Sequence, residues 1–276
     1  MDSELKFKFV KSLAIDLNRG EIALPSFPDI VVRIRAALDD PDCSGEQLAA
    51  IIGTEPVLAS RMLILANSAA YNPGGTKISN LPATIARIGF AQVRSAAITH
   101  AMDQLHSATE LKPIRPHLHK NWVRGLRLAA LAEVLAARAK GLNANDAFIA
   151  GLMSPVDELY VLTKHGDYPD LLTDLTAREE IVAEFGAGIA RSIVEHWNFP
   201  DEIVNAVSPA DDPQSEMAKA SLADAVVAAK TALAGDEVCF ADCPSLTRLG
   251  VDVTDPEPLL AAYNDKLTAL RAAVAA

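Results

Sequence analysis

The sequence predicts an all-α protein. Apolar residues recur at steps of three and four along almost the whole chain, which is the spacing of the buried face of a helix. Convincing pairs of segments that alternate apolar and polar residues, as neighbouring strands do, are missing. Clusters of turn residues, such as the Asn-Pro-Gly-Gly of residues 72–75, interrupt the helical spacing. We therefore expect a succession of helices joined by turns.

The predicted helices in the first part of the chain begin at recognisable capping signals. Ser44 and Gln47 have the spacing of a capping box, and Pro56 stands where a helix tolerates proline, in its first turn. Residues 24–28 contain two prolines and are predicted to be an extended connector, because the residue before a proline avoids helical angles. Apolar spacing places helices through residues 5–17, 30–38, 48–52, 58–65, 85–88 and 90–105.

Two prolines, Pro113 and Pro116, mark the best candidate for a hinge between two helical domains. We expect an N-terminal helical subdomain over residues 1–112 and a C-terminal helical subdomain over residues 113–276. Pro155 is expected to kink the helix in which it lies. The second subdomain is predicted to contain helices through residues 122–134, 148–159, 189–197, 215–234 and 257–276, with a capping box at 176–179.

The charge balance of the chain argues against several classes of partner. It contains 36 acidic and 25 basic residues, which gives a formal net charge of −11. Nucleic acid and anionic membrane surfaces are bound through Lys and Arg, so neither is an expected partner. Apolar stretches are too short for a membrane span, and the first residues lack the features of a signal peptide. We expect a cytoplasmic protein.

The residues capable of chemistry do not gather into a recognisable site. Cys43, Cys239 and Cys243 are too few for a disulfide framework and lack the second ligand pair of a zinc site. His117 and His119 are two residues apart at a helix start, where their side chains would point in different directions. Nucleophile elbows and glycine-rich phosphate loops are absent from the sequence. Taken alone, the residues indicate no reaction.

A series of short motifs in a fixed order resembles the HDOD domain family. The Asn-Ser-Ala stretch that starts at Asn67 and the Gly-Phe pair that starts at Gly89 are the most specific of them. The resemblance covers roughly residues 20–210 and becomes looser in its second half. The motifs lie at residues 24–28, 38–41, 48–52, 55–59, 65–71, 85–90, 147–153 and 196–204.

The resemblance implies a helical signalling module that has lost the catalytic site of its relatives. HDOD domains are related to HD-type metal-dependent phosphohydrolases, in which a His and an adjacent His-Asp pair ligate the metal. In this chain Arg124 fills the first position, and Ser154 and Pro155 fill the pair. Arginine stays protonated and proline offers no side-chain donor atom. We therefore expect no metal, no cofactor and no phosphohydrolase activity.

Five residues within the matched motifs are candidates for a partner-binding surface. For Asn67 and Ser68, the competing interpretation is that they satisfy backbone groups where a helix ends. Tyr71 could cover a domain interface instead of a partner. Arg87 and Arg94 could face solvent, or bind an acidic partner or a phosphate.

A glycine and two tryptophans in the motifs are interpreted as structural. Gly89 is expected to allow close packing or a left-handed turn between two helices. Trp122 and Trp197 are expected to anchor the core rather than to bind a ligand.

The leading hypothesis for function is a non-enzymatic regulatory module of bacterial signal transduction. The module would act through contacts with an unidentified signalling protein, and a homodimer is a further hypothesis. Because about 20 residues precede the match, we expect no receiver domain within this sequence. Input would then come from another protein or from another part of a longer one.

Two alternatives for function stay open. A nucleotide or cyclic dinucleotide could bind in the former active-site pocket with Arg124 on a phosphate, because arginine suits bidentate phosphate recognition. The same Arg124 could instead fill that pocket by pairing with a carboxylate. A residual phosphohydrolase could use a displaced metal site near His117 and His119.

Overall fold

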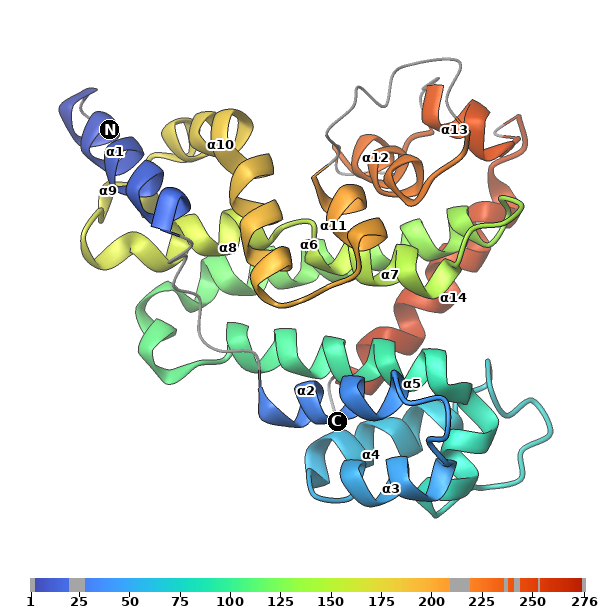
Figure 1. The fold of residues 1–276 in the computed structure, drawn as a ribbon. Coiled ribbons are helices and arrows are strands. Elements are labelled where there is room, and N and C mark those ends of the chain that lie inside the picture. The colour runs from blue at the N-terminus through green and yellow to red at the C-terminus, as the bar shows by residue number, and fades with distance from the viewer. Residues whose placement is uncertain are drawn as a thin grey trace. The chain divides into compact units, whose positions relative to one another are not determined.

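The regular elements in the described part of the chain are all helices. The computed structural model describes residues 3–19, 28–208, 219–235, 238–240, 244–252 and 254–274 (Figure 1). The prediction of an all-α protein is confirmed. Except for Pro28, the connector predicted at residues 24–28 lies outside the described residues, as does Cys243. Among the described helices, none is long and apolar enough to cross a membrane.

The described helices divide into two compact units, and neither unit is a continuous piece of the chain. The first unit contains the N-terminal helix and the described part of residues 106–260. The second contains the described parts of residues 26–105 and 261–276. The predicted division between residues 112 and 113 differs from this one chiefly at the two ends of the chain. A linear boundary cannot show which unit a terminal helix packs against.

The first unit is built on α6 (Arg115–Ala136), whose residues 128–132 are all buried. A helix stretch that is apolar on every side belongs in an interior. Helices α7, α8 and α12 pack on it. The elements of this unit besides α6 are α1 (Ser3–Arg19), η1 (Thr109–Ile114), α7 (Ala144–Met153), α8 (Val156–Thr163), η2 (Lys164–Gly166), α9 (Asp170–Thr173), α10 (Leu175–His196), α11 (Asp201–Val207), α12 (Leu222–Ala232), α13 (Pro244–Leu249) and the start of α14 (Glu257–Val274).

Helix α1 joins the first unit through an apolar face and one carboxylate. Phe9 is buried, and its ring meets the ring of Tyr168 edge-on with the centroids 5.1 Å apart. Asp16 accepts hydrogen bonds from the Tyr160 hydroxyl at 2.8 Å and from the Lys164 ammonium at 2.9 Å. Figure 1 shows α1 close to α8, α9 and α10, although a long stretch of sequence separates them.

Helices α6 and α7 approach so closely that one position requires glycine. A Cβ atom at Gly151 would lie 2.8 Å from the Leu128 carbonyl oxygen and 2.9 Å from Ala129 Cα. These distances are shorter than any normal contact, so a side chain at this position would force the helices apart. The same close contact holds the C-terminal end of α7 against α6.

Three predicted boundaries in the first unit are wrong. Pro155 does not kink one helix but separates α7 from α8, because its ring nitrogen has no hydrogen to donate. Helix α10 is capped by Asp174, whose side chain accepts the Ala177 N–H at 2.9 Å, and not by a capping box at residues 176–179. Residues 215–218 of the helix predicted from residue 215 lie outside the described residues, and the described helix starts at Leu222.

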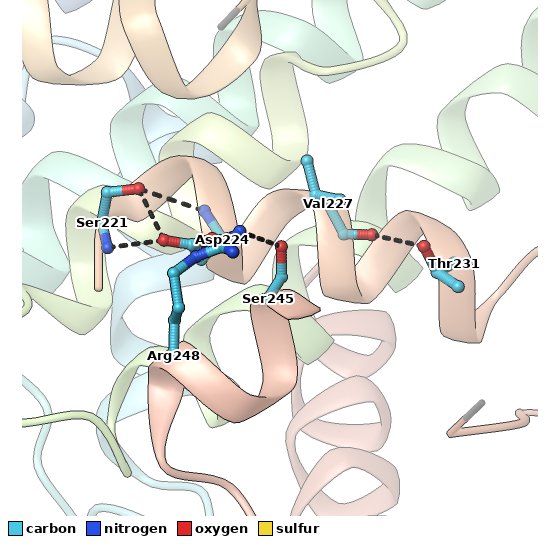
Figure 2. A network of polar contacts seen from close by, with 6 residues as sticks. All are labelled: Ser221, Asp224, Val227, Thr231, Ser245 and Arg248. Atoms are coloured by element: carbon cyan, nitrogen blue, oxygen red, sulfur yellow. Dashed lines mark hydrogen bonds and ion pairs between the residues drawn. The ribbon is translucent and has the colours of Figure 1, made fainter. Parts of the chain in front are cut away.

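A buried ion pair joins the start of α12 to α13 (Figure 2). Ser221 and Asp224 form a capping box, in which each side chain accepts the other residue's backbone N–H. Asp224 Oδ1 also accepts a hydrogen bond from Arg248 Nε at 2.8 Å, and both side chains are buried. Arg248 donates a further hydrogen bond to Ser245 Oγ at 3.1 Å. The two charges are therefore satisfied within the unit.

The second unit shows two of the predicted local features. Ser44 and Gln47 form the expected capping box, with contacts of 3.2 and 2.9 Å. Gly89 has a φ of +79° and breaks the helical geometry between the two predicted helices. A Cβ there would meet nothing within 4 Å, so the backbone angle and not close packing requires the glycine. The elements of this unit are α2 (Asp29–Leu38), α3 (Gly45–Ile52), α4 (Pro56–Ala66), α5 (Leu81–His106) and α14 from residue 261 onward.

Candidate functional site

The three residues singled out at the former metal positions lie where α6 passes the turn between α7 and α8. Gly125 allows this approach, since a Cβ there would lie 3.3 Å from the Leu152 carbonyl oxygen and 3.4 Å from Pro155 Cγ. Arg124 precedes Gly125 on α6, and Ser154 precedes Pro155 in the turn. The structure therefore brings Arg124, Ser154 and Pro155 into one neighbourhood.

The polar atoms of the turn are used for hydrogen bonds within the protein. The buried Ser154 hydroxyl donates to the Ala150 carbonyl at 3.0 Å. The Pro155 carbonyl accepts from Asn121 Nδ2 at 3.0 Å, and Asn121 Oδ1 lies 2.9 Å from His106 Nε2. Ser154 and Pro155 therefore form a structural turn whose one side-chain hydroxyl is buried and donates to the backbone of α7.

Glu158, in the first turn of α8, holds two arginines from other helices. Its Oε2 accepts from Arg124 Nη1 at 3.1 Å, and its Oε1 lies 3.4 Å from Arg178 Nε. Arg178 is buried and also donates to the Leu171 carbonyl at 2.9 Å. The Arg124 side chain is 56% exposed, so water weakens its pair with Glu158. Of the two arrangements considered for Arg124, the pairing with a carboxylate is the one in this structure.

Asp157 and Lys230 add two opposite charges beside this network. Gly186 of α10 makes room for Asp157, because a Cβ at Gly186 would lie 2.6 Å from Asp157 Oδ2. Burial raises the pKa of Asp157, and Lys230 opposes that rise. Burial lowers the pKa of Lys230, and Asp157 opposes that fall. Burial therefore disfavours the charged form of both the Asp157 and the Lys230 side chains.

A cavity of about 590 Å³ lies against this network. Its lining has four basic and two acidic side chains, so it is locally positive in a chain whose net charge is −11. The basic residues are Arg124, Arg127, Arg178 and Lys230, the acidic ones are Glu158 and Glu179, and the apolar ones are Leu128, Leu175, Val182, Ala183, Leu233 and Ala234.

The donor set at the former metal positions does not fit a divalent cation. Arg124 places a positive charge there, the Ser154 hydroxyl is engaged, and Pro155 has no donor atom. Of the nearby carboxylates, Glu158 pairs with Arg124 and Arg178, and the charge of Lys230 favours the ionised form of Asp157. Among the residues that the structure describes, no group of three or more His, Cys, Asp or Glu side chains could hold a metal.

The two histidines considered for a displaced metal site lie at the start of α6. His119 is exposed, whereas His117 is partly buried. Burial and then the positive charge of Arg178 lower the pKa of His117. A neutral imidazole can ligate a metal, but a carboxylate or second imidazole that would complete a site is not grouped with it in the described residues.

The sequence interpretation missed the residues that surround Arg124. Glu158 and Asp157 follow the Ser154-Pro155 turn directly, and this adjacency is a local signal that could have indicated them. Arg178 falls within the capping box predicted at residues 176–179, and Lys230 within the helix predicted over residues 215–234. Only the packing of α8, α10 and α12 brings these four charges together.

Asn67 and Ser68 satisfy backbone groups at the end of α4. Asn67 Nδ2 donates to the carbonyls of Leu63 and Ile78, both at 2.8 Å, and Asn67 Oδ1 accepts the Ile78 N–H at 2.8 Å. Ser68 Oγ donates to the Leu65 carbonyl at 2.7 Å. These side chains tie the loop after α4 to the helix, as the competing interpretation expected. Contact with a partner stays a prediction for both.

Of the other three candidates for a partner surface, only Arg87 is more exposed than Asn67 and Ser68. Arg87 is exposed and donates to Asn72 Oδ1, whereas Tyr71 is half-buried. Arg94 lies 3.5 Å from the exposed Asp39 carboxylate, which makes a weak surface pair.

Comparison with known families identifies this architecture. The family model of the HDOD domain matches residues 24–213, which is most of the chain. The chain belongs to the HDOD domain family. The family match extends through α11, so it includes Arg124, Glu158 and Arg178 but ends before Lys230.

Solved structures share the HDOD fold over nearly the whole chain. A candidate metal-dependent phosphohydrolase from Shewanella amazonensis SB2B is 25% identical, with a TM-score of 0.78 over 98% of this chain and 99% of its own. An HDOD domain protein of unknown function from Geobacter sulfurreducens is 22% identical, with a TM-score of 0.64 over 91% of this chain and 92% of its own. A candidate signal transduction protein from Marinobacter aquaeolei VT8 is 18% identical, with a TM-score of 0.62 over 92% of this chain and 59% of its own. The last two likenesses show the fold alone.

One curated relative is much longer than the segment that it shares with this HDOD chain. An uncharacterised protein of Treponema pallidum (strain Nichols) is 23% identical over 198 residues. That alignment covers 67% of this chain and 37% of the relative.

Proposed function

We propose that this HDOD protein is a non-catalytic module of signal transduction that acts by binding another protein. The observation that carries the proposal is the Arg124–Glu158–Arg178 arrangement. At a position where an HD hydrolase holds its metal, this chain has a cation whose charge is matched by a protein carboxylate. A divalent ion at that place would be repelled by the guanidinium group. Without an ion to activate water, hydrolysis of a phosphate ester has no source of nucleophile there.

We place the proposed partner surface on α5, just after the Gly89 break. Phe90 is 41% exposed, and Arg94 lies one helical turn further along the same face. An exposed aromatic ring beside arginine has the composition of a binding hot spot. Arg87 adds a second positive charge on the other side of the break. These charges favour a partner protein with an acidic patch.

The partner surface is tested by comparing three forms of the purified chain as bait in the same cell extract. We expect the wild type to capture a defined protein and the Phe90→Ser/Arg94→Glu double variant to lose it. Lys140→Glu is the matched control, because Lys140 is an exposed turn residue of the first unit and its variant also reverses a charge. Equal capture by all three forms would contradict the proposed surface.

The absence of catalysis is tested with a panel of phosphate mono- and diesters in the presence of Mg²⁺, Mn²⁺ or Fe²⁺. We expect no turnover above the rate without protein. Turnover that depends on the added metal and disappears in Glu158→Gln would support the alternative of a residual phosphohydrolase.

A further inference from the structure

The proposed partner surface on α5 does not include the residues that line the locally positive cavity of the first unit. We propose that this cavity binds a phosphorylated small molecule, in which a phosphoryl group is joined to an apolar or aromatic body. The proposal goes beyond the proposed function, because it concerns a ligand that the first unit alone would hold. Three features of the cavity support it: its basic side chains, the incomplete hydrogen bonding between Glu158 and its arginines, and its apolar wall.

The basic side chains offer hydrogen-bond donors that the protein leaves open. Arg124 uses one of its five N–H groups on Glu158, and the described residues provide no other hydrogen-bond acceptor for it. Lys230 lines the cavity and makes no hydrogen bond to the described residues, although the charge of Asp157 attracts it. A guanidinium fork and an ammonium from two helices are the groups that proteins use to hold a phosphoryl group.

Glu158 is the carboxylate that pairs with Arg124 and Arg178 in the cavity, and it leaves some of their N–H groups without a hydrogen bond. Arg178 is buried, yet its Nε makes no hydrogen bond to the described residues, and the nearest Glu158 oxygen lies 3.4 Å away. An unsatisfied buried N–H group costs free energy, which an acceptor of better geometry would recover. A phosphoryl group carries more charge and more acceptor oxygens than one carboxylate. It would therefore compete with Glu158 for Arg124 and Arg178.

The remaining wall of the cavity is apolar and large enough for more than an inorganic ion. Leu128, Val182 and Leu233 line it. Leu175 also lines it and is 53% exposed. The volume of about 590 Å³ falls within the range of about 300–1,000 Å³ that is usual for small-molecule sites. An apolar or aromatic body attached to the phosphoryl group would cover these side chains.

The ligand class is tested by isothermal titration calorimetry of the wild-type chain with three probes: AMP, adenosine and inorganic phosphate. We expect AMP to bind, and adenosine and inorganic phosphate to bind at least about tenfold more weakly. Adenosine that binds as tightly as AMP would overturn the role of the phosphoryl group. Inorganic phosphate that binds as tightly as AMP would overturn the role of the apolar wall, and no binding by AMP would overturn the proposal altogether.

The location is tested by titrating AMP into charge-neutralised variants. We expect Arg124→Gln and Lys230→Gln each to weaken AMP binding about tenfold, since each removes a charge-assisted hydrogen bond. Glu158→Gln is expected to strengthen AMP binding, because it removes the competing carboxylate. Lys140→Gln removes an exposed charge elsewhere in the first unit and is expected to leave AMP binding unchanged. Circular dichroism checks each fold, and if Glu158→Gln does not fold, the other two variants decide.

Unchanged AMP affinity in both Arg124→Gln and Lys230→Gln would overturn the site. This outcome is distinguishable from a failure of the proposed function. Capture of a partner protein depends on Phe90 and Arg94 of α5, and the calorimetry contains no partner.

Discussion

At the scale of single residues, the close contact at Gly151 shows how little room the core of the first unit leaves. The nearest atoms to a Cβ there belong to the backbone of α6, which cannot rotate away as a flexible side chain would. Gly188 of α10 is the opposite case, because a Cβ at Gly188 would meet nothing within 4 Å. The two glycines therefore form a matched pair for measuring the effect of packing.

We expect Gly151→Ala to destabilise the protein by about 1–3 kcal/mol through overpacking. Gly188→Ala is expected to be neutral or to stabilise it by up to about 1 kcal/mol, since alanine favours a helix more than glycine does. Urea denaturation of both variants measures the free energy of unfolding. Equal destabilisation by the two substitutions would show that the close approach of α6 and α7 is not the cause.

A second residue-scale prediction concerns His100, which is buried in the second unit. Its Nδ1 lies 3.2 Å from Arg61 Nη1, and because arginine only donates, Nδ1 accepts and the ring is neutral. Burial, followed by the charge of Arg61, lowers the pKa of His100 below 6.5, although Glu55 and Asp103 oppose this. The unfolded chain therefore binds more protons than the folded one as pH falls below about 6.5.

The stability due to neutral His100 is accordingly present above about pH 6.5 and lost as pH falls toward the lower pKa of the folded state. We expect the melting temperature of His100→Gln to fall less than that of the wild type between about pH 7.5 and about pH 5.5. Differential scanning fluorimetry at matched ionic strength makes this comparison. A wild-type fall that His100→Gln reproduces in full would assign the pH dependence to other groups.

At the scale of elements, buried polar contacts fix how short helices join. The α12–α13 junction depends on Asp224, which caps its own helix and pairs with Arg248 of the next (Figure 2). Both charges are enclosed, so removing one leaves the other without a partner in a poorly solvated place. The Arg94–Asp39 pair of the second unit provides a contrast, because both of its side chains are accessible.

We expect Arg248→Met to destabilise the first unit by about 3–5 kcal/mol, because the Asp224 carboxylate stays buried without its cation. Adding Asp224→Asn should recover part of the loss, since the asparagine carbonyl can still accept the Ser221 N–H in the capping box but carries no charge. Arg94→Met is the surface control, with an expected change of about 0–1 kcal/mol. Chemical denaturation followed by circular dichroism provides these values, and a loss at Arg248 no larger than at Arg94 would contradict the reasoning.

At the scale of the whole molecule, stability is expected to be independent of divalent metal. The positions that we assign to the metal ligands of HD relatives carry the Arg124 guanidinium group, which pairs with Glu158, and the Ser154-Pro155 turn. A resident structural metal would add its binding free energy to folding, and a chelator would then lower the melting temperature. We propose that the ion pairs of Glu158 with Arg124 and Arg178 stabilise this region in place of a metal.

We therefore expect EDTA, and added Mn²⁺ or Mg²⁺, to leave the melting temperature unchanged. Elemental analysis of the purified protein should find Mn, Fe and Zn well below one equivalent per chain. A chelator that lowers the melting temperature, together with a stoichiometric metal, would contradict the assignment of these positions as non-ligating.

The features that could be predicted from the sequence are those that a few neighbouring residues decide. Ser44 and Gln47 cap α3 as expected, and Gly89 breaks α5 as expected, because both depend on local backbone geometry. Ser221 and Asp224 carry a similar local signal, which was missed, and α12 consequently starts later than predicted. Pro155 indicates an interruption of the helical geometry, either as a kink within one helix or as a boundary between two. Which of these forms depended on whether α7 and α8 could continue as one helix.

The sequence by itself determined the all-α class and the HDOD family, and it predicted Arg124, Ser154 and Pro155 at the metal-ligand positions of HD relatives. These follow from periodicity and from residue identity, which need no knowledge of distant contacts. Only the tertiary structure decided that Glu158 and Arg178 meet Arg124, that Lys230 lines the same cavity, and that α1 belongs with the second half of the chain. Such contacts join residues far apart in sequence, so they depend on how helices pack rather than on any local pattern.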